Sequence, residues 1–149
     1  HDHGRTFERI LHYYSVPTSQ VVIEINESWK VDDQVLAEAA DNYRNLGYRI
    51  ALDHSGGAEV GVERLHRLRP DIVKINATET GLMSLEAQVS RFRSDGIQVC
   101  ISGIETPGQL EKARHSGAEL LQGYRLGRPA FSPVEQAFHG MERQRALQI

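Results

Sequence analysis

Hydrophobic and polar residues follow one another along the chain in a repeating order that predicts alternating strands and helices. Five short apolar runs, rich in Val, Ile and Leu, are typical of strands buried on both faces of a parallel sheet. They recur roughly every 22 to 29 residues, which is the spacing of β/α units. The five runs read VVIEIN, RIALDH, DIVKIN, QVCISG and LLQGYRLG.

The segments between these runs have the periodicity of amphipathic helices. Each carries apolar residues three or four positions apart and ends at a glycine or proline, as helices often do. The chain before Val21 and the chain beyond Ser132 are also predicted to be helical. The apolar stripes are Val35, Leu36, Ala39, Ala40, Tyr43 and Leu46 before Gly47; Val62, Leu65 and Leu68 before Pro70; Leu85, Val89 and Phe92 before Gly96; and Leu110 and Ala113 before Gly117.

This alternation predicts an α/β fold in a single domain of 149 residues. The pattern fits a (β/α)8 barrel and an open doubly wound sheet equally well. In both folds, side chains at the C-terminal ends of the strands converge on one site. The polar residues at the ends of the apolar runs are therefore the candidates for function.

Composition and charge narrow the classes of function. A formal net charge of −3 and a sequence pI near 6.2 give no footprint for a nucleic-acid polymer or an anionic membrane. The single Cys100 excludes a disulfide within the chain and a cysteine-built zinc site, and its apolar neighbours favour a buried thiol. No apolar stretch approaches the roughly 20 residues that span a bilayer, and no signal peptide is visible. The sequence therefore predicts a soluble, cytoplasmic protein without direct membrane insertion.

Three charged residues lie within or at the end of predicted strands. Glu24 sits inside an apolar run, so we expect it to meet a cation, a metal ion or hydrogen-bond donors, unless its strand is an edge and the side chain faces water. Asp53 precedes a glycine-containing loop and suits a hard divalent metal. Lys74 could hold a phosphate or a water nucleophile, or it could extend to solvent from an outer strand.

Four further polar residues carry weaker signals. His54 is either a neutral metal ligand or a surface histidine. Ser102 lacks the pattern of a nucleophile elbow. Glu105 could bind a metal, or it could cap or charge the first turn of the next helix. Gln122 lies inside an apolar run, which predicts a buried hydrogen-bonding role.

Taken in order, these blocks resemble the EAL-domain family, the bacterial cyclic di-GMP phosphodiesterases and their inactive relatives. The family pattern runs E-x-T-E, A-L-D-D-F-G-T-G, K-I-D, A-E-G-V-E-T and Q-G-Y-x-x-G-x-P. This chain has EINE, ALDHSGGA, KIN, ISGIET and QGYRLGRP at the corresponding places. The resemblance extends from about Thr6 to Pro133 and implies a (β/α)8 TIM-barrel-like EAL fold.

The resemblance also implies roles for individual residues. Active members hydrolyse one phosphodiester of cyclic di-GMP with two divalent cations, usually Mg²⁺ or Mn²⁺. Glu24 and Asp53 correspond to metal-binding residues, and Glu27 to a glutamate that stabilises a loop. Three further residues correspond to catalytic positions and would be vestigial here. Lys74 corresponds to the lysine that orients water or phosphate, Glu105 to the second glutamate of A-E-G-V-E, and Gln122 to the glutamine near the attacking water.

The departures from the family pattern fall on the charged positions. His54 stands in place of the second aspartate of D-D-F-G, Asn76 in place of the aspartate of K-I-D, and Ser102 in place of the first glutamate of A-E-G-V-E. Ser55 replaces the phenylalanine of the loop. Three carboxylates are thus missing from a site that must hold roughly four positive charges, and the sequence predicts a dismantled metal centre.

The resemblance covers only the C-terminal three-fifths of the family domain. Residues 1–149 correspond to about the last five β/α units, and the E-A-L glutamate and the asparagine strand that follows it have no counterpart. Five strands cannot close an eight-stranded barrel, and an open edge invites pairing. We therefore expect either a piece of a longer protein or a domain completed by another chain or an unusual dimer.

Together these observations predict a degenerate EAL domain in bacterial cyclic di-GMP signalling. We expect it to be catalytically inactive, to need no cofactor, and to act through a protein partner, a homo-oligomer or weak binding of cyclic di-GMP. The alternative is a cyclic di-GMP phosphodiesterase in the full-length protein, dependent on Mg²⁺ or Mn²⁺, in which His54 supplies a nitrogen ligand.

Overall fold

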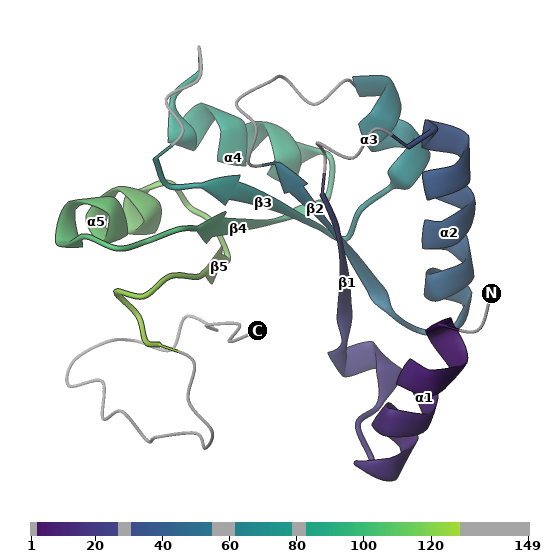
Figure 1. The fold of residues 1–149 in the computed structure, drawn as a ribbon. Coiled ribbons are helices and arrows are strands. Elements are labelled where there is room, and N and C mark those ends of the chain that lie inside the picture. The colour runs from purple at the N-terminus through teal and green to yellow at the C-terminus, as the bar shows by residue number, and fades with distance from the viewer. Residues whose placement is uncertain (1–2, 27–30, 55–61, 79–82, 129–149) are drawn as a thin grey trace.

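The computed structural model describes residues 3–26, 31–54, 62–78 and 83–128. Within them, strands and helices alternate as the sequence predicts (Figure 1). The strands are β1 (Val22–Asn26), β2 (Arg49–His54), β3 (Ile72–Asn76), β4 (Gln98–Ser102) and β5 (Leu120–Leu121). The helices are α1 (His3–Tyr13), α2 (Asp33–Asn45), α3 (Val62–Leu68), α4 (Leu85–Ser94) and α5 (Pro107–His115), with a 3-10 turn η1 (Thr18–Gln20) before β1.

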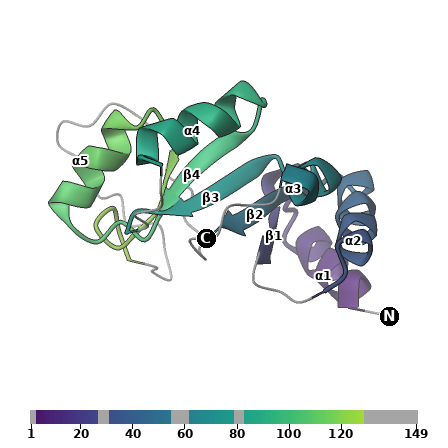
Figure 2. The same ribbon diagram turned by 90° about the horizontal axis from the view of Figure 1, so that it is seen from above.

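The five described strands form one parallel sheet in the order β1-β2-β3-β4-β5. An open doubly wound sheet would reverse its strand order and carry helices on both faces. Here the order never reverses, and the buried residues of α2 to α5 all join one core on one face of the sheet (Figures 1 and 2). This is the winding of a (β/α) barrel, so the structure decides between the two alternatives that periodicity left open.

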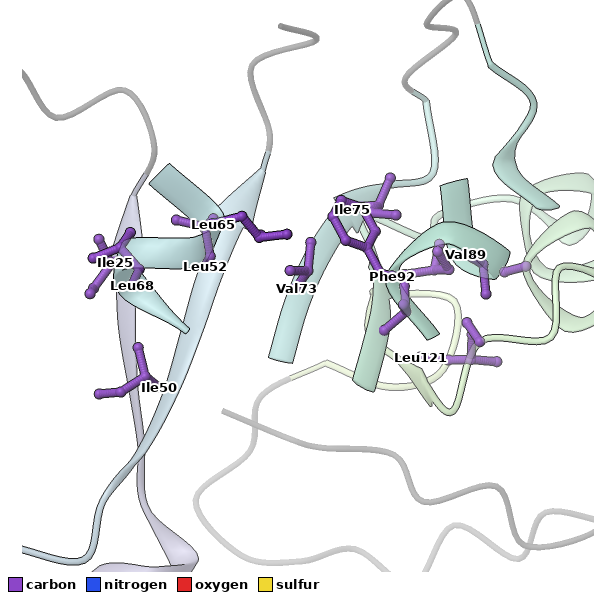
Figure 3. Packing of buried hydrophobic residues seen from close by; sticks show 14 of the residues in the cluster. Ile25, Ile50, Leu52, Leu65, Leu68, Val73, Ile75, Val89, Phe92 and Leu121 are labelled. Carbon is purple, nitrogen blue, oxygen red and sulfur yellow. The ribbon is translucent and has the colours of Figure 1, made fainter. Parts of the chain in front are cut away.

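The core between the sheet and the helices consists of closely packed aliphatic side chains and one phenylalanine. Every second residue of the strands points into it, because successive side chains of a strand face opposite sides. Figure 3 shows side chains of α3 meeting those of β1 and β2, and side chains of α4 meeting Ile75. Ile50, Leu52, Val73, Ile75, Val99 and Ile101 are fully buried.

The opposite face of the sheet, called the inner face below, carries the remaining strand residues. Away from the C-terminal ends of the strands, this face carries a small apolar cluster of Ala51, Ile72, Cys100 and Leu120, with Val22 packed against it. Cys100 is 3% exposed, which confirms the expectation of a buried thiol. Toward the C-terminal ends of the strands, the same face becomes polar.

Three helices end where the glycines of the sequence predict. Gly47, Gly96 and Gly117 follow α2, α4 and α5 with φ values of 90°, 77° and 80°, the left-handed conformation that glycine adopts without strain. Side chains cap the other ends of these helices: Asp32, Ser84 and Thr106 each accept hydrogen bonds from backbone amides of the first turn.

Two details differ from the sequence expectations. Val35 and Leu46 are 55% and 50% exposed, so the buried stripe of α2 is narrower than its pattern and centres on Leu36 and Ala40. The last apolar run forms a strand of two residues, because the chain turns away after Leu121. The helix before Val21 is confirmed as α1, whereas the helix expected beyond Ser132 lies outside the described residues.

Candidate functional site at the strand ends

The register of the sheet brings the polar strand-end residues together on the inner face. Paired residues of neighbouring parallel strands point to the same face of a sheet. Asn26 pairs with Asp53, Asp53 with Lys74, and Asn76 with Ser102. Glu24 lies two residues before Asn26 and so shares its face. We call Glu24, Asp53, Lys74, Asn76 and Ser102 the strand-end cluster.

An ion pair joins the first and third strands within this cluster. The Nζ atom of Lys74 donates a hydrogen bond to Oε2 of Glu24 at 2.6 Å. The Lys74 side chain is 11% exposed and the Glu24 side chain 36%. The cation that the sequence led us to expect beside Glu24 is therefore Lys74. Glu24 also lies on β1, an edge strand of the described sheet, and remains partly open to solvent.

The solvent-facing alternative for Lys74 is wrong. Its strand, β3, is the central strand of the five, and the residue as a whole is 9% exposed. A buried ammonium group needs a partner, because losing its hydration is costly. The carboxylate of Glu24 supplies that partner across the neighbouring strand β2.

The Cys100 thiol lies beside Lys74 on the inner face of the sheet. Cys100 pairs in register with Lys74. The pKa of the thiol is raised to about 11, chiefly by burial; the ammonium of Lys74 lowers the pKa, and the carboxylates of Glu24 and Asp53 raise it. All three charges therefore act on one buried atom, which places Asp53 in the same electrostatic environment as the ion pair. At neutral pH the thiol is protonated and is no nucleophile.

The two neutral residues of the cluster make local contacts. Oδ1 of Asn76 accepts hydrogen bonds from the backbone N–H of Thr78 at 2.9 Å and from its hydroxyl at 2.7 Å. This is an Asx-type turn that shapes the chain leaving β3. The Ser102 hydroxyl donates to the carbonyl oxygen of Ile75 at 3.3 Å. Both side chains are thus engaged with backbone or loop groups of neighbouring residues.

Glu105 lies just after β4, before the first residue of α5. Thr106, not Glu105, is the N-cap: its hydroxyl accepts from Gln109 N, while the Gln109 side chain accepts from the backbone amides of Thr106 and Glu105. The Glu105 side chain is exposed. The capping alternative for Glu105 is therefore wrong, and its role as a metal ligand stays a prediction.

Backbone hydrogen bonds join the loop after β4 to the turn after β5. The amide of Ile104 donates to the carbonyl of Gln122 at 3.1 Å, and the amide of Arg125 donates to the carbonyl of Ile104 at 3.0 Å. We call residues 103–105 and 122–125 the loop junction. Gln122 thus takes part in the loop junction through its backbone, and its side chain is half-buried.

A glycine at the centre of the loop junction is a residue whose role the sequence analysis missed. A Cβ atom on Gly123 would lie 2.2 Å from the carbonyl oxygen of Ile104 and 2.4 Å from its nitrogen. No side chain fits there, because both obstacles are backbone atoms. The glycine of the Q-G-Y block was the signal in the sequence for this close approach.

Several predicted site residues lie beyond what the structure describes. Glu27 and Ser55 fall outside the described residues, and of His54 only the backbone is described, at the end of β2 opposite Ile75. Among the described residues, no group of three or more His, Cys, Asp and Glu side chains is arranged to hold a metal ion. The same part of the chain contains no helix long and apolar enough to cross a membrane.

Comparison with known proteins agrees with this architecture. The family model for the EAL domain matches residues 2–129. The chain is 30% identical to the probable cyclic di-GMP phosphodiesterase PdeA of Escherichia coli (strain K12), over 81% of this chain and 18% of PdeA. It is 29% identical to the blue light- and temperature-regulated antirepressor BluF of the same organism, over 70% of this chain and 28% of BluF.

The fold has a counterpart among solved structures. The crystal structure of the Bacillus subtilis YkuI protein, with an EAL domain, in complex with substrate c-di-GMP and calcium, matches with a TM-score of 0.73 and 28% identity. The match covers 90% of this chain and 36% of the YkuI chain. This chain therefore belongs to the EAL-domain family, and it spans a minor part of the length of these relatives.

Proposed function

We propose that this chain is a degenerate EAL domain of bacterial cyclic di-GMP signalling that does not hydrolyse the nucleotide. It works in the cytoplasm through contacts with a protein partner or a second copy, or through weak binding of cyclic di-GMP. The observation that carries the proposal is the state of Asn76 and Ser102, which stand where the family pattern has carboxylates. Both side chains are neutral and make hydrogen bonds to neighbouring groups of the protein.

The described donors do not fit a pair of divalent ions. Two such ions bring roughly four positive charges, and carboxylate oxygens balance them in sites of this kind. The strand-end cluster offers two carboxylates, Glu24 and Asp53, and one ammonium group, so its net charge is about −1. Asn76 and Ser102 are neutral, and both engage neighbouring groups in the protein. No catalytic step through a metal pair follows from this set.

The relatives support a role in signalling without requiring catalysis. PdeA is named a probable cyclic di-GMP phosphodiesterase, and YkuI was solved with c-di-GMP as its substrate. BluF, of comparable identity, is named an antirepressor. The relatives of this chain thus include proteins named for hydrolysis and one named for regulation. A site with too few ligands favours the second kind of role for this chain.

Hydrolysis of cyclic di-GMP tests the proposal. Purified chain and the Glu24→Ala variant are incubated with the nucleotide and either MgCl2 or MnCl2, and the linear product is quantified by chromatography. We expect both proteins to give the same background. Turnover by the wild type that disappears in Glu24→Ala would falsify the proposal, since it would require a working metal ligand at Glu24.

Binding of the nucleotide is a separate question. Calorimetric titration with cyclic di-GMP is expected to show weak or no binding, and a sub-micromolar Kd would instead make the domain a nucleotide receptor. Size-exclusion chromatography with light scattering distinguishes a monomer, which needs a different partner, from a homo-oligomer.

The second candidate is a phosphodiesterase activity in a longer protein that contains this chain. It is favoured by Glu24, Asp53 and Lys74, which share one face at the strand ends as an active site would require. In that case Glu105, Gln122 and His54 would complete the site, with Mg²⁺ or Mn²⁺. Assaying the full-length protein with several divalent metals separates the two candidates.

A further inference from the structure

We propose that α3 is a latched helix, which the side chain of Arg44 on α2 holds closed at its C-terminal end. When this contact is released, α3 leaves the sheet while the strands stay folded. We call the contacts among Asp41, Arg44 and Arg69 the α2–α3 latch. The inference goes beyond the proposed function, because it concerns a movement built into the fold and not the chemistry of the strand ends.

The C-terminal end of α3 differs from those of α2, α4 and α5, which are each followed by a glycine at positive φ. α3 ends at Leu68, and the next residue, Arg69, has a φ of 44°. A residue with a side chain is strained in this left-handed conformation, whereas glycine is not. The backbone of α3 therefore lacks the relaxed end that a glycine gives the other three helices.

Arg44 supplies a cap for α3 from the neighbouring helix, which lies beside it in both views of the fold (Figures 1 and 2). Its Nη2 atom donates hydrogen bonds to the carbonyl oxygens of Leu68 and Arg69, both at 2.9 Å. The last carbonyl groups of a helix have no partner within it, and they carry a partial negative charge. A cationic side chain of α2 thus satisfies the carbonyl groups at the strained end of α3.

A shared carboxylate completes the latch. Asp41 lies on α2 three residues before Arg44, and its Oδ1 atom accepts hydrogen bonds from Arg44 and, at 3.0 Å, from Nη2 of Arg69. The side chains of Asp41 and Arg69 are 47% and 67% exposed. Salt ions can therefore screen this part of the latch, so we expect added salt to weaken it.

α3 is also small enough to open separately from the sheet. It has seven residues, and so short a helix is not stable by itself in water. Leu65 and Leu68 are buried against β1 and β2 (Figure 3), and Arg64 pairs with Asp33 of α2 at 3.3 Å. β2 and β3, on either side of α3 in the chain, pair directly with each other. Opening of α3 thus leaves the pairing of these strands intact.

Hydrogen exchange followed by mass spectrometry measures this opening at residues 62–69. The proteins are the wild type, Arg44→Met, Arg67→Met, and Arg44→Met combined with Arg69→Gly. Arg67 lies on α3, is exposed, and within the described part of the chain pairs with no other side chain, so it controls for the loss of an arginine.

We expect Arg44→Met to speed exchange in α3 about tenfold, with no change in β2 and β3 and no change in Arg67→Met. The double variant should recover most of the lost protection, because glycine ends a helix at positive φ without strain. Unchanged exchange of α3 in Arg44→Met, equal acceleration of α3 and the strands, or an equal effect of Arg67→Met would overturn the inference. Lack of recovery in the double variant would also contradict it.

Salt tests the latch in the wild type, and so covers the case in which Arg44→Met does not fold. Raising NaCl from about 0.05 M to about 0.5 M should speed exchange in α3 severalfold relative to β2 and β3. Exchange in α3 that responds to salt no more than exchange in these strands would overturn the inference.

Discussion

The strand-end cluster and the loop junction lie at the same end of the sheet, yet they match the EAL pattern to very different degrees. In the cluster, Asn76 and Ser102 stand where the pattern has carboxylates. In the loop junction, Gly103, Gln122 and Gly123 stand where the pattern has the same residues. The cluster supplies charge to a site, whereas the junction supplies packing and backbone hydrogen bonds. The difference indicates that the fold depends on the junction more than on the ligand positions of the cluster.

The largest expected effect is at the centre of the loop junction. Gly123→Ala places a Cβ atom 2.2 Å from the Ile104 carbonyl oxygen, so the two loops must move apart. We expect a loss of about 3 kcal/mol in the free energy of unfolding, measured by urea denaturation. Gly108→Ala is the matched control: a Cβ there meets nothing within 4 Å, and alanine in a helix should be neutral or mildly stabilising. Equal stability of the two variants would contradict the packing role of Gly123.

The second effect concerns the base of the strand-end cluster and depends on pH. Burial raises the pKa of Cys100 to about 11 in the folded protein, while the unfolded chain releases this proton at a lower pH. The stabilising contribution is therefore complete below the unfolded pKa and is lost as the pH rises toward 11.

Urea denaturation of the wild type and Cys100→Ala measures this contribution. Between about pH 8 and about pH 10.5, the wild type should lose about 2 kcal/mol more stability than the variant. The difference between the two proteins removes the contribution of tyrosines, which titrate in the same range. The same pH dependence in the two proteins would show that Cys100 is accessible to water, and that the thiol beside the strand-end cluster is not shielded from solvent.

A smaller effect is expected where the cluster shapes a loop. Asn76→Ala removes the acceptor of two hydrogen bonds from Thr78 and should cost about 1 kcal/mol in unfolding free energy. Asn76→Asp keeps the acceptor and restores the family residue, so its stability should stay within a few tenths of a kcal/mol of the wild type. If both variants lose the same stability, the hydrogen bonds to Thr78 are not what Asn76 contributes.

The smallest effect is expected at Ser102. Its hydroxyl makes one long hydrogen bond, at 3.3 Å, to Ile75 O, so Ser102→Ala should change the unfolding free energy by less than about 0.5 kcal/mol. This near-neutral result is expected if the fold depends on the loop junction more than on the ligand positions of the strand-end cluster. A loss above about 1 kcal/mol would mean that Ser102 has become structurally important in its own right.

Much of this architecture was predictable from the sequence, for a physical reason. Strands buried on both faces read as continuous apolar runs, and glycine marks the helix ends because it adopts positive φ without strain. Period-2 alternation then places Asp53, Lys74, Asn76 and Ser102 at matching strand ends. The length of the last strand was overestimated, because the apolar residues beyond Leu121 belong to a turn.

The contacts between distant segments could not be predicted in the same way. The Lys74–Glu24 pair spans 50 residues of sequence and depends on the register of β1, β2 and β3 together. The close approach of Gly123 to Ile104 likewise arises only when two loops meet. The N-cap at Thr106 was missed for a local reason. The sequence offered Glu105 as a possible cap, whereas the cap is the next residue, Thr106, whose capping box is completed by the Gln109 side chain.

The strand ends keep the scaffold of an EAL site, and we propose that they have lost its two-metal chemistry. Equilibrium dialysis against Mn²⁺, with bound metal counted per chain, measures whether the metal pair still binds. We expect no saturable binding by the wild type at micromolar free Mn²⁺. Two Mn²⁺ ions bound per chain, and lost in both Glu24→Gln and Asp53→Asn, would show that the metal centre is intact.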